Sequence, residues 1–347
     1  MAPLARFRAG ADHTPTPLMA ALVSPRGGGQ AFGPGLWDAA HVAGWKRVVD
    51  AVHARGCVIF AQLFALGRAA EGSSSGGVAD ADELVSSSAV AMGEGGSVPR
   101  ALREEEVWAF VEDWVEAARG AVEGAGFDGV EIYGANGYLI DQFTQDTCNR
   151  RTDGCGGSVE NRARFAIEVA KAVAGAVGPE RTAMRLSPWR TFQGMRMADP
   201  VPQFTYLIKE LRRLDLAYVH LFQSRIPGDD DDAKENSERL DLMVQAWGKG
   251  KPVLIAGGLE TDSARHLLDE EYPDYDVVAV FGRYFLSTPD LVYRIQNGIP
   301  ANPYHRETFY GDGKRVPELG YVDYPFSDEY LAEQADLQSG VKWESSL

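Results

Sequence analysis

The sequence predicts an α/β protein whose parallel strands form a TIM-type (β/α)8 barrel. Short apolar runs rich in β-branched residues alternate with longer helix-like stretches almost to the end of the 347-residue chain. Such an alternation is typical of a parallel sheet with helices packed outside it. An open doubly wound sheet is the alternative, but it usually carries a Gly-x-Gly-x-x-Gly turn after its first strand, and no such turn stands there. We therefore expect the barrel.

Each element follows from its local pattern. A first strand is possible at Met1–Phe7. Six apolar runs are expected as further strands: Cys57–Leu63, Gly129–Tyr133, Ala183–Leu186, Leu216–Leu221, Pro252–Ala256 and Asp276–Phe281. Seven stretches are expected as helices: His41–Ala54, Glu104–Glu123, Ser158–Val177, Pro202–Leu214, Leu240–Trp247, Thr261–Leu268 and Pro289–Asn297. We expect residues 1–347 to form one domain, with a surface excursion at 71–100 and a mostly irregular C-terminal extension at 302–347.

Composition narrows the class of protein. Hydrophobic residues make up 45% and charged residues 24%, as in an ordinary globular protein. The formal charge of −16 disfavours nucleic acid and anionic membranes as partners. No apolar run is long enough to span a membrane, and the N-terminus has no hydrophobic signal core. Three cysteines without metal-ligand spacing fit a reducing compartment. We expect a soluble cytoplasmic enzyme without a metal.

The active site of such a barrel lies at the C-terminal ends of its strands. This rule selects Gln62, Arg185 and the residues from Tyr133 to Tyr138. Gly257-Gly258 and Gly282-Arg283 end the last two strands, where barrels often bind phosphate on backbone amides. Either pair alone would indicate only a tight turn. Because glycine permits close approach and arginine adds a bidentate charge, the two pairs together predict a phosphate site.

One long motif is far more specific. The stretch from Glu131 to Arg162 reads EIYGANGYLIDQFTQDTCNRRTDGCGGSVENR, and further matches stand at Ala2–Leu4, Gln62–Arg68, Met184–Pro188, Phe281–Arg283 and Thr308–Tyr310. On these residues the chain resembles the old yellow enzyme family of flavin-dependent ene-reductases, in particular its fungal branch associated with ergot-alkaloid pathways. The resemblance implies FMN at the mouth of the barrel and NADPH as the reductant. Hydride then passes through the flavin to the C=C bond of an α,β-unsaturated aldehyde or ketone, in secondary metabolism.

The resemblance also implies roles for single residues. Tyr138 matches the tyrosine that gives a proton to the α-carbon, and Asn136 and Tyr133 match the pair that binds the carbonyl oxygen. Gln62 matches the residue on the pyrimidine edge of the flavin, and Arg185 the cation near its N1 and O2. The alternatives without a function are a packing role for Tyr138 and a structural ion pair for Arg185. The remaining cofactor positions implied are Pro3, Leu4, Ala5, Gly257, Gly258, Gly282 and Arg283, and the remaining substrate positions are Gln30, Phe64, Phe309 and Tyr310.

The chain departs from the family pattern at several of these positions. Tyr133 stands in place of a histidine, Ala5 of a threonine, Gln30 of a tyrosine and Phe64 of a tryptophan. The chain also passes through Leu22 and Val23 directly into a Ser-Pro-Arg-Gly-Gly segment, so that one helix and most of one strand are missing, on the order of twenty residues. We expect a barrel that is incomplete or rearranged around strands one and two: either strand one meets strand three, or two edges stay open.

Three functions remain open from the sequence. The first is an FMN-dependent ene-reductase, supported by Tyr138, Gln62 and Arg185. The second is a repurposed barrel that catalyses a non-redox isomerisation or cyclisation, with or without flavin. The third is a non-catalytic remnant that only binds a ligand. We expect a small enone or enal as the substrate, and a monomer or homodimer.

Overall fold

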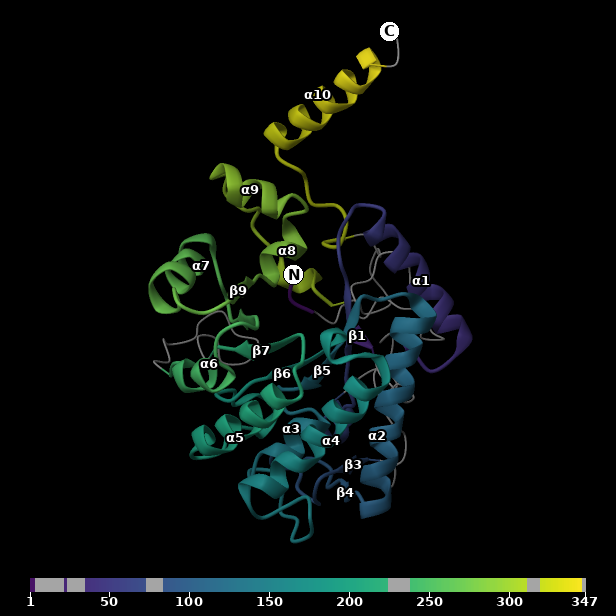
Figure 1. Ribbon diagram of the computed structural model, residues 1–347, viewed down its shortest axis with the longest axis vertical. Coiled ribbons are helices and arrows are strands. Elements are labelled where there is room, and N and C mark those ends of the chain that lie inside the picture. Colours follow the sequence, from purple (N-terminus) through teal and green to yellow (C-terminus); the bar gives the residue numbers. More distant parts are fainter. Residues whose placement is uncertain (4–21, 24–34, 73–83, 224–237, 311–318, 345–347) are drawn as a thin grey trace.

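A seven-stranded parallel sheet forms the centre of the protein (Figure 1). The computed structural model describes residues 1–3, 22–23, 35–72, 84–223, 238–310 and 319–344. Within these ranges the strands lie in the order β1-β2-β5-β6-β7-β8-β9, so that their order in space is their order in the chain. Their bounds are β1 Leu22–Val23, β2 Phe60–Leu63, β5 Gly129–Gly134, β6 Thr182–Leu186, β7 Tyr218–Phe222, β8 Val253–Ala256 and β9 Val277–Val280. This sequential order is that of a (β/α)8 barrel.

Helices cover the outside of this sheet (Figure 1). The α-helices of the described ranges are α1 Ala39–His53, α2 Glu104–Arg119, α3 Leu139–Thr144, α4 Val159–Val177, α5 Pro200–Arg213, α6 Asp241–Trp247, α7 Thr261–His266, α8 Arg283–Ser287, α9 Leu291–Asn297 and α10 Asp328–Glu344. The six apolar runs and the seven helices that the sequence predicts are all confirmed. Ser158 caps α4 as expected, because its side chain accepts a hydrogen bond from the backbone of Asn161. The short helices α3 and α8 were not predicted.

The two faces of the sheet differ in chemistry because side chains alternate along each strand. In β5, Val130 and Ile132 belong to the large apolar core that the strands share with the outer helices. Trp45, Trp114 and Trp247 fill that core and are fully buried. The alternate residues point to the inside of the barrel, where buried polar side chains gather: Gln62, Glu131, Arg185 and His220. The barrel interior is therefore the polar part of the molecule.

The described N-terminal residues lie beside β2 and β9, on either side of the predicted gap in the barrel. Leu22 and Val23 pair in parallel with Gln62 and Leu63 of β2, so that the short strand β1 takes the position of the second barrel strand. Ala2 lies beside β9, where its backbone N–H donates to Phe281 O at 2.8 Å. Within the described residues the Leu22–Val23 strand, and not the strand predicted at Met1–Phe7, borders the third barrel strand. The described sheet ends at β1 and β9, as expected for an incomplete barrel with two open edges. The remaining residues of the strand predicted at Met1–Phe7 lie outside the described ranges.

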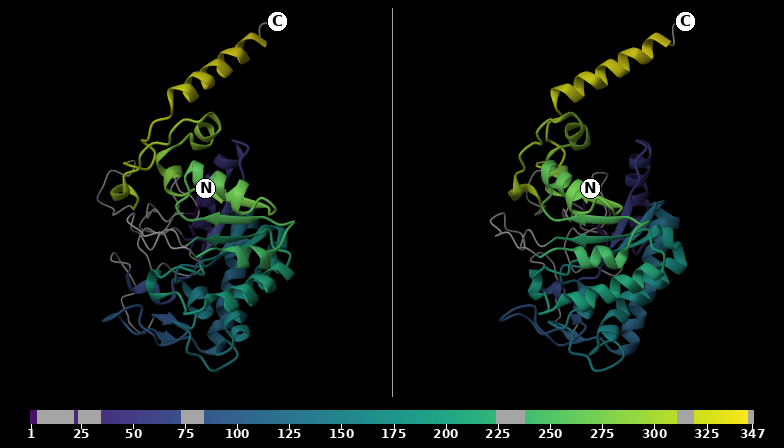
Figure 2. Two further views of the ribbon diagram at one scale, coloured as in Figure 1. Left: turned by 90° about the vertical axis from the view of Figure 1, so that its left-hand side faces the viewer. Right: turned by 60° about the vertical axis from the view of Figure 1, so that its left-hand side comes forward.

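Two segments add to the barrel. A parallel strand pair, β3 Val85–Ser86 and β4 Arg100–Ala101, lies within the segment predicted as a surface excursion. Its serines 86–88 are buried, and Ser87 Oγ donates to Gln142 O at 2.7 Å. In the C-terminal extension the prediction missed α10, which points away from the sheet and its helices (Figures 1 and 2). Its leucines Leu331 and Leu337 are exposed, so no buried apolar stripe marks this helix in the sequence.

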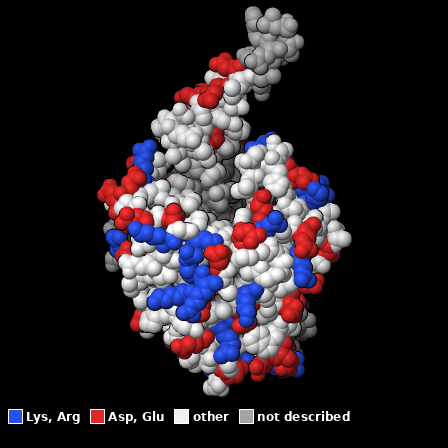
Figure 3. Space-filling view, viewed as in Figure 1, with Lys and Arg blue, Asp and Glu red and all other residues white. Residues whose placement is uncertain are grey.

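The surface carries both signs of charge. Figure 3 shows lysine and arginine side chains gathered in the middle of one face, with acidic side chains around them. Ion pairs join the two signs of charge elsewhere on the surface as well: Lys251 Nζ lies 3.0 Å from Asp215 Oδ1. None of the helices within the described ranges combines the length and apolar character that crossing a bilayer requires.

Candidate active site

A buried polar network lies inside the barrel. Glu131 Oε1 accepts a hydrogen bond from Gln62 Nε2, and Glu131 Oε2 lies 2.9 Å from His220 Nδ1. Burial alone would raise the pKa of the Glu131 carboxyl, but His220 and Arg185 outweigh it and lower that pKa. Burial lowers the pKa of His220, and the positive charge of Arg185 adds to this effect. The network therefore favours the ionised form of Glu131, which accepts a hydrogen bond from Gln62.

Arg185 connects this network to aromatic rings at the strand ends. Its guanidinium carbon lies 5.4 Å from the ring centre of Tyr133 and 5.5 Å from that of Phe222. A guanidinium over an aromatic face is attracted by the ring quadrupole. Arg185 is 4% exposed, and its Nε has no hydrogen-bond partner among the described residues. A buried donor left in this way is suited to an acceptor atom of a ligand.

Three aromatic rings form a cluster next to Arg185. The ring centres of Tyr133 and Tyr138 lie 5.0 Å apart, and Phe64 lies 5.4 Å from Tyr138 and 6.3 Å from Tyr133. Asn136 Nδ2 donates to Tyr133 Oη at 2.6 Å. The structure thus brings the predicted residues Phe64, Tyr133, Asn136 and Tyr138 together, and it joins the two predicted carbonyl-binding residues to each other. With Asn136 as its donor, the Tyr133 hydroxyl can direct its own proton to a further acceptor.

The turn that presents Asn136 and Tyr138 has an unusual backbone. Asn136 and Gly137 have φ angles of 54° and 77°, in the left-handed region. A Cβ atom on Gly137 would lie 2.8 Å from Gln193 Cβ, so a side chain there would be both strained and crowded. Asn136 N also donates to Ser187 Oγ at 2.7 Å, at the end of β6. The glycine in this motif therefore allows the turn that aims both side chains.

Two residues of α3 hold this turn, and the sequence analysis did not single them out. Gly137 N donates to Asp141 Oδ2 at 2.9 Å, and Gln142 Nε2 donates to Gly137 O at 2.7 Å. Both side chains are fully buried. Burial raises the pKa of Asp141 to about 7, although Gln145 and Gly137 donate hydrogen bonds to its carboxyl. The available signal was their position within the motif, one helical turn after Gly137.

The predicted phosphate residues lie at the ends of β8 and β9. Gly257 has a φ of 145°, and a Cβ atom there would lie 2.8 Å from Gln223 Cβ, so this position requires glycine. Gly258 follows with a φ of 70°. Gly282 directly precedes α8, and Arg283 Nη1 donates to Tyr304 Oη at 3.2 Å. Gly257-Gly258 and Gly282-Arg283 therefore follow neighbouring strands of one sheet, as predicted.

The other predicted residues are more dispersed. Phe309 is buried and its ring centre lies 5.5 Å from that of Tyr304, whereas Tyr310 is 46% exposed. Pro3 is half-buried next to Ala2. The predicted site residues Leu4, Ala5 and Gln30 lie outside the described ranges.

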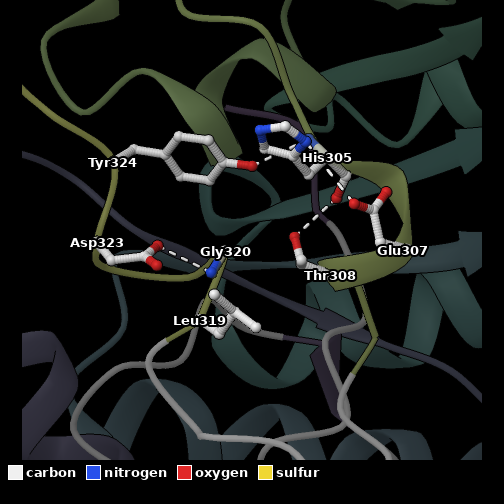
Figure 4. A pocket seen from close by; sticks show the side chains of 7 residues that line it. All are labelled: His305, Glu307, Thr308, Leu319, Gly320, Asp323 and Tyr324. Atoms are coloured by element: carbon white, nitrogen blue, oxygen red, sulfur yellow. Dashed lines mark hydrogen bonds and ion pairs between the residues drawn. The ribbon is translucent and has the colours of Figure 1, made fainter.

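A pocket of about 570 Å³ that the sequence did not predict lies in the C-terminal region (Figure 4). Its lining residues are His305, Glu307, Thr308, Leu319, Gly320, Asp323 and Tyr324. Several of their polar groups pair with one another: His305 N donates to Tyr324 Oη at 3.0 Å, and Gly320 N donates to Asp323 Oδ1 at 2.8 Å. None of the rings of Phe64, Tyr133 and Tyr138 lines this pocket, whereas Thr308 in its wall directly precedes the predicted substrate residue Phe309.

Comparison with known proteins places this site in a family. Residues 8–302 match the model of the NADH:flavin oxidoreductase / NADH oxidase family. The chain is 50% identical to chanoclavine-I aldehyde reductase fgaOx3 of Penicillium roqueforti, over 95% of this chain and 92% of that protein. It is 46% identical to the probable inactive dehydrogenase easA of Claviceps purpurea, over 97% and 93%. The first alignment spans 353 residues, more than this whole chain, so gaps fall within it.

Solved structures agree with the sequence relatives. The fold matches morphinone reductase with a TM-score of 0.81 and 34% identity, over 94% of this chain and 92% of that one. It matches the old yellow enzyme homologue from Zymomonas mobilis with a TM-score of 0.80 and 34% identity, over 94% of both chains. The neighbours thus confirm both the barrel and the resemblance that the motif indicated.

The residues present fit a flavin. Gln62 Oε1, Arg185 Nε and Gln223 Oε1 are buried polar atoms without partners in the described part of the chain, and they suit a planar ring with both donors and acceptors. The glycines and Arg283 at the ends of β8 and β9 suit its phosphate. The chain belongs to the NADH:flavin oxidoreductase / NADH oxidase family, and it is an FMN-dependent oxidoreductase of the old yellow enzyme type.

Proposed function

We propose that this protein reduces the C=C bond of an α,β-unsaturated aldehyde or ketone, with NADPH as the reductant. The observation that carries the proposal is the cluster of Tyr133, Asn136 and Tyr138 next to the buried Arg185. It combines hydrogen-bond donors for a carbonyl oxygen with a hydroxyl that can deliver a proton. Two relatives that are named aldehyde reductases, at 50% and 48% identity, favour an aldehyde.

Each residue of the site would have its own role in the reaction. Bound FMN supplies the hydride that reaches the β-carbon of the alkene. Tyr133, with Asn136 behind it, donates a hydrogen bond to the carbonyl oxygen, which polarises the alkene and stabilises the negative charge that develops there. Tyr138 gives the proton to the α-carbon, and the ring of Phe64 packs beside that of Tyr138.

The cofactor would be held from two sides. Gln62 and Arg185 bind the pyrimidine edge of the flavin, and the glycines at the ends of β8 and β9 bind its phosphate together with Arg283. Pro3, Leu4 and Ala5 border the flavin, and Gln30, Phe309 and Tyr310 border the substrate. A cytoplasmic location, a single-domain organisation and a monomeric or homodimeric state belong to the same proposal.

The test separates the two halves of the reaction. The purified protein should carry stoichiometric FMN in its visible spectrum and oxidise NADPH when a simple enone is added. Tyr138→Phe should slow reoxidation of the reduced flavin by the enone by about 10²–10⁴-fold, the usual contribution of a general acid, while NADPH still reduces the flavin at the normal rate. Tyr206→Phe on α5 is the matched control and should change neither rate. Equal loss of both rates in Tyr138→Phe would count against the proton-donor role.

A non-redox isomerisation or cyclisation is the second candidate. It is favoured by the departures from the family pattern at Phe64 and Tyr133, whose rings lie next to that of Tyr138. Conversion of a substrate without net NADPH consumption would support this candidate. A protein that stays colourless with added FMN would overturn the reductase.

A further inference from the structure

The carboxylate of Glu131 is surrounded by donors in the barrel interior. It accepts a hydrogen bond from Gln62 Nε2 on β2 and lies 2.9 Å from His220 Nδ1 on β7. The Tyr218 side chain on β7 also lies close to it, and burial together with the Glu131 carboxylate raises the pKa of Tyr218. Glu131 is 4% exposed, and Gln62 and His220 are each 1% exposed. Glu131 on β5 therefore contacts β2 on one side and β7, two strands away, on the other.

The sheet register explains how the Glu131 side chain contacts residues of β7. Gln62, Glu131, Ala183 and Tyr218 stand opposite one another on four successive strands. On β6 the position between Glu131 and Tyr218 is Ala183, whose side chain is a single methyl group. The glutamate can therefore extend past β6 to the two side chains of β7. A larger residue at position 183 would fill this space.

The carboxylate fixes the direction of both hydrogen bonds. An ionised carboxylate only accepts hydrogen bonds, so Gln62 must turn its NH₂ group toward Glu131. Its carbonyl Oε1 then points elsewhere and has no partner among the described residues. In the same way His220 must carry its proton on Nδ1, which leaves Nε2 as a bare acceptor, also unpartnered within the described chain.

We propose that Glu131 is a positioning residue that fixes the hydrogen-bond polarity of the cofactor site. By holding the amide of Gln62, it makes this side chain an acceptor toward the ligand and thereby selects a ring edge that carries an N–H group. The inference rests on the proposed assignment of Gln62 to the pyrimidine edge of the flavin, whose donor is N3–H. In Glu131→Gln the residue can donate as well as accept, so the amide of Gln62 can turn and present NH₂ to the ligand.

The test uses FMN binding and needs no substrate. FMN labelled with ¹⁵N is bound to the wild-type protein and to Glu131→Gln, and exchange of the N3 proton with solvent is followed by NMR. We expect the Kd for FMN to rise at least about tenfold in Glu131→Gln, and protection of the N3 proton to fall by a similar factor. Glu105→Gln, on the exposed side of α2, is the matched control and should change neither quantity. A Glu131→Gln protein that binds FMN with a fully protected N3 proton would overturn the inference.

A second measurement does not depend on a variant that folds. In the wild-type protein with ¹⁵N-labelled histidine, His220 should show a protonated Nδ1 and an unprotonated Nε2. The opposite tautomer, or an imidazolium at neutral pH, would refute the assigned polarity. Failure of the proposed enone reduction would appear as absent turnover while both NMR results still hold.

Discussion

Removal of the Gln142 side-chain amide should destabilise the turn that carries the proposed catalytic groups. Gln142 Nε2 donates to Leu66 O at 2.9 Å and to Gly137 O at 2.7 Å. Its Oε1 accepts from Ser86 Oγ at 2.8 Å and from Arg68 N at 3.2 Å. The side chain is fully buried, so no water can replace these four bonds. Gln142→Leu keeps a similar volume and removes all of them.

The cost follows from the number of bonds. A net contribution of roughly 1 kcal/mol for each bond, with buried groups left unpaired, gives a loss of about 3–5 kcal/mol in the free energy of unfolding. Urea unfolding of the FMN-loaded protein should show a lower midpoint at an unchanged m-value. Reoxidation of the flavin by an enone should slow in the same variant, because Gly137 lies between Asn136 and Tyr138.

A matched control is available on α5. Gln203 is equally buried, but its side chain makes two hydrogen bonds, to Arg162 Nε and Val159 O, far from the turn. Gln203→Leu should cost about half as much stability and leave reoxidation unchanged. Equal losses in the two variants, or normal reoxidation in Gln142→Leu, would refute the positioning role of Gln142.

Three further predictions concern pH, substrate and the C-terminal region. Burial raises the pKa of Asp141 from 3.8 to about 7, so the folded protein keeps a proton that the unfolded chain releases. The free energy of unfolding should therefore fall by up to about 4 kcal/mol as the pH rises from 4 to 7. In Asp141→Asn the free energy of unfolding, measured with urea, should depend less on pH over this range. Tyr133→His should tighten enone binding severalfold in a flavin-absorbance titration, and weaker binding would mean that the tyrosine is specifically used. Asp290→Ala should cost about 3–5 kcal/mol in urea unfolding because it leaves the buried Arg294, now 2.8 Å from Asp290 Oδ1, without its partner; a loss below 1 kcal/mol would contradict this.

The fold could be predicted from the sequence where periodicity is strong. The run from Gly129 to Tyr133 and the valines of the helix that begins at Glu104 show the periods of two and 3.6 that strands and helices require. The prediction failed where an element is short or lacks a buried stripe. Leu22 and Val23 form a strand only because β2 offers them a partner edge, and α10 keeps its leucines exposed. Such elements are determined by tertiary contacts that a local pattern does not contain.

From the sequence we could single out the residues that the structure brings together at the strand ends, but not the residues that hold them in place. Tyr138, Asn136, Gln62 and Arg185 were found because they stand at strand ends and in a specific motif. Glu131 stands in the same motif, but a single glutamate in a strand gives no sign that it reaches across β6 to His220. That reach depends on the register of four strands and on the small size of Ala183. The roles of the strand-end residues themselves stay predictions until the variants are measured.

The polar interior of the barrel is built on strands that follow the predicted N-terminal gap. Gln62, Glu131, Arg185 and His220 stand on β2, β5, β6 and β7, which pair with one another in an unbroken parallel ladder. The gap that the sequence predicts falls before β2, and Leu22 and Val23 pair with Gln62 and Leu63. A strand that has neighbours on both sides is held in register by both ladders. The position of Gln62, and with it the hydrogen bond to Glu131, is therefore fixed from two sides.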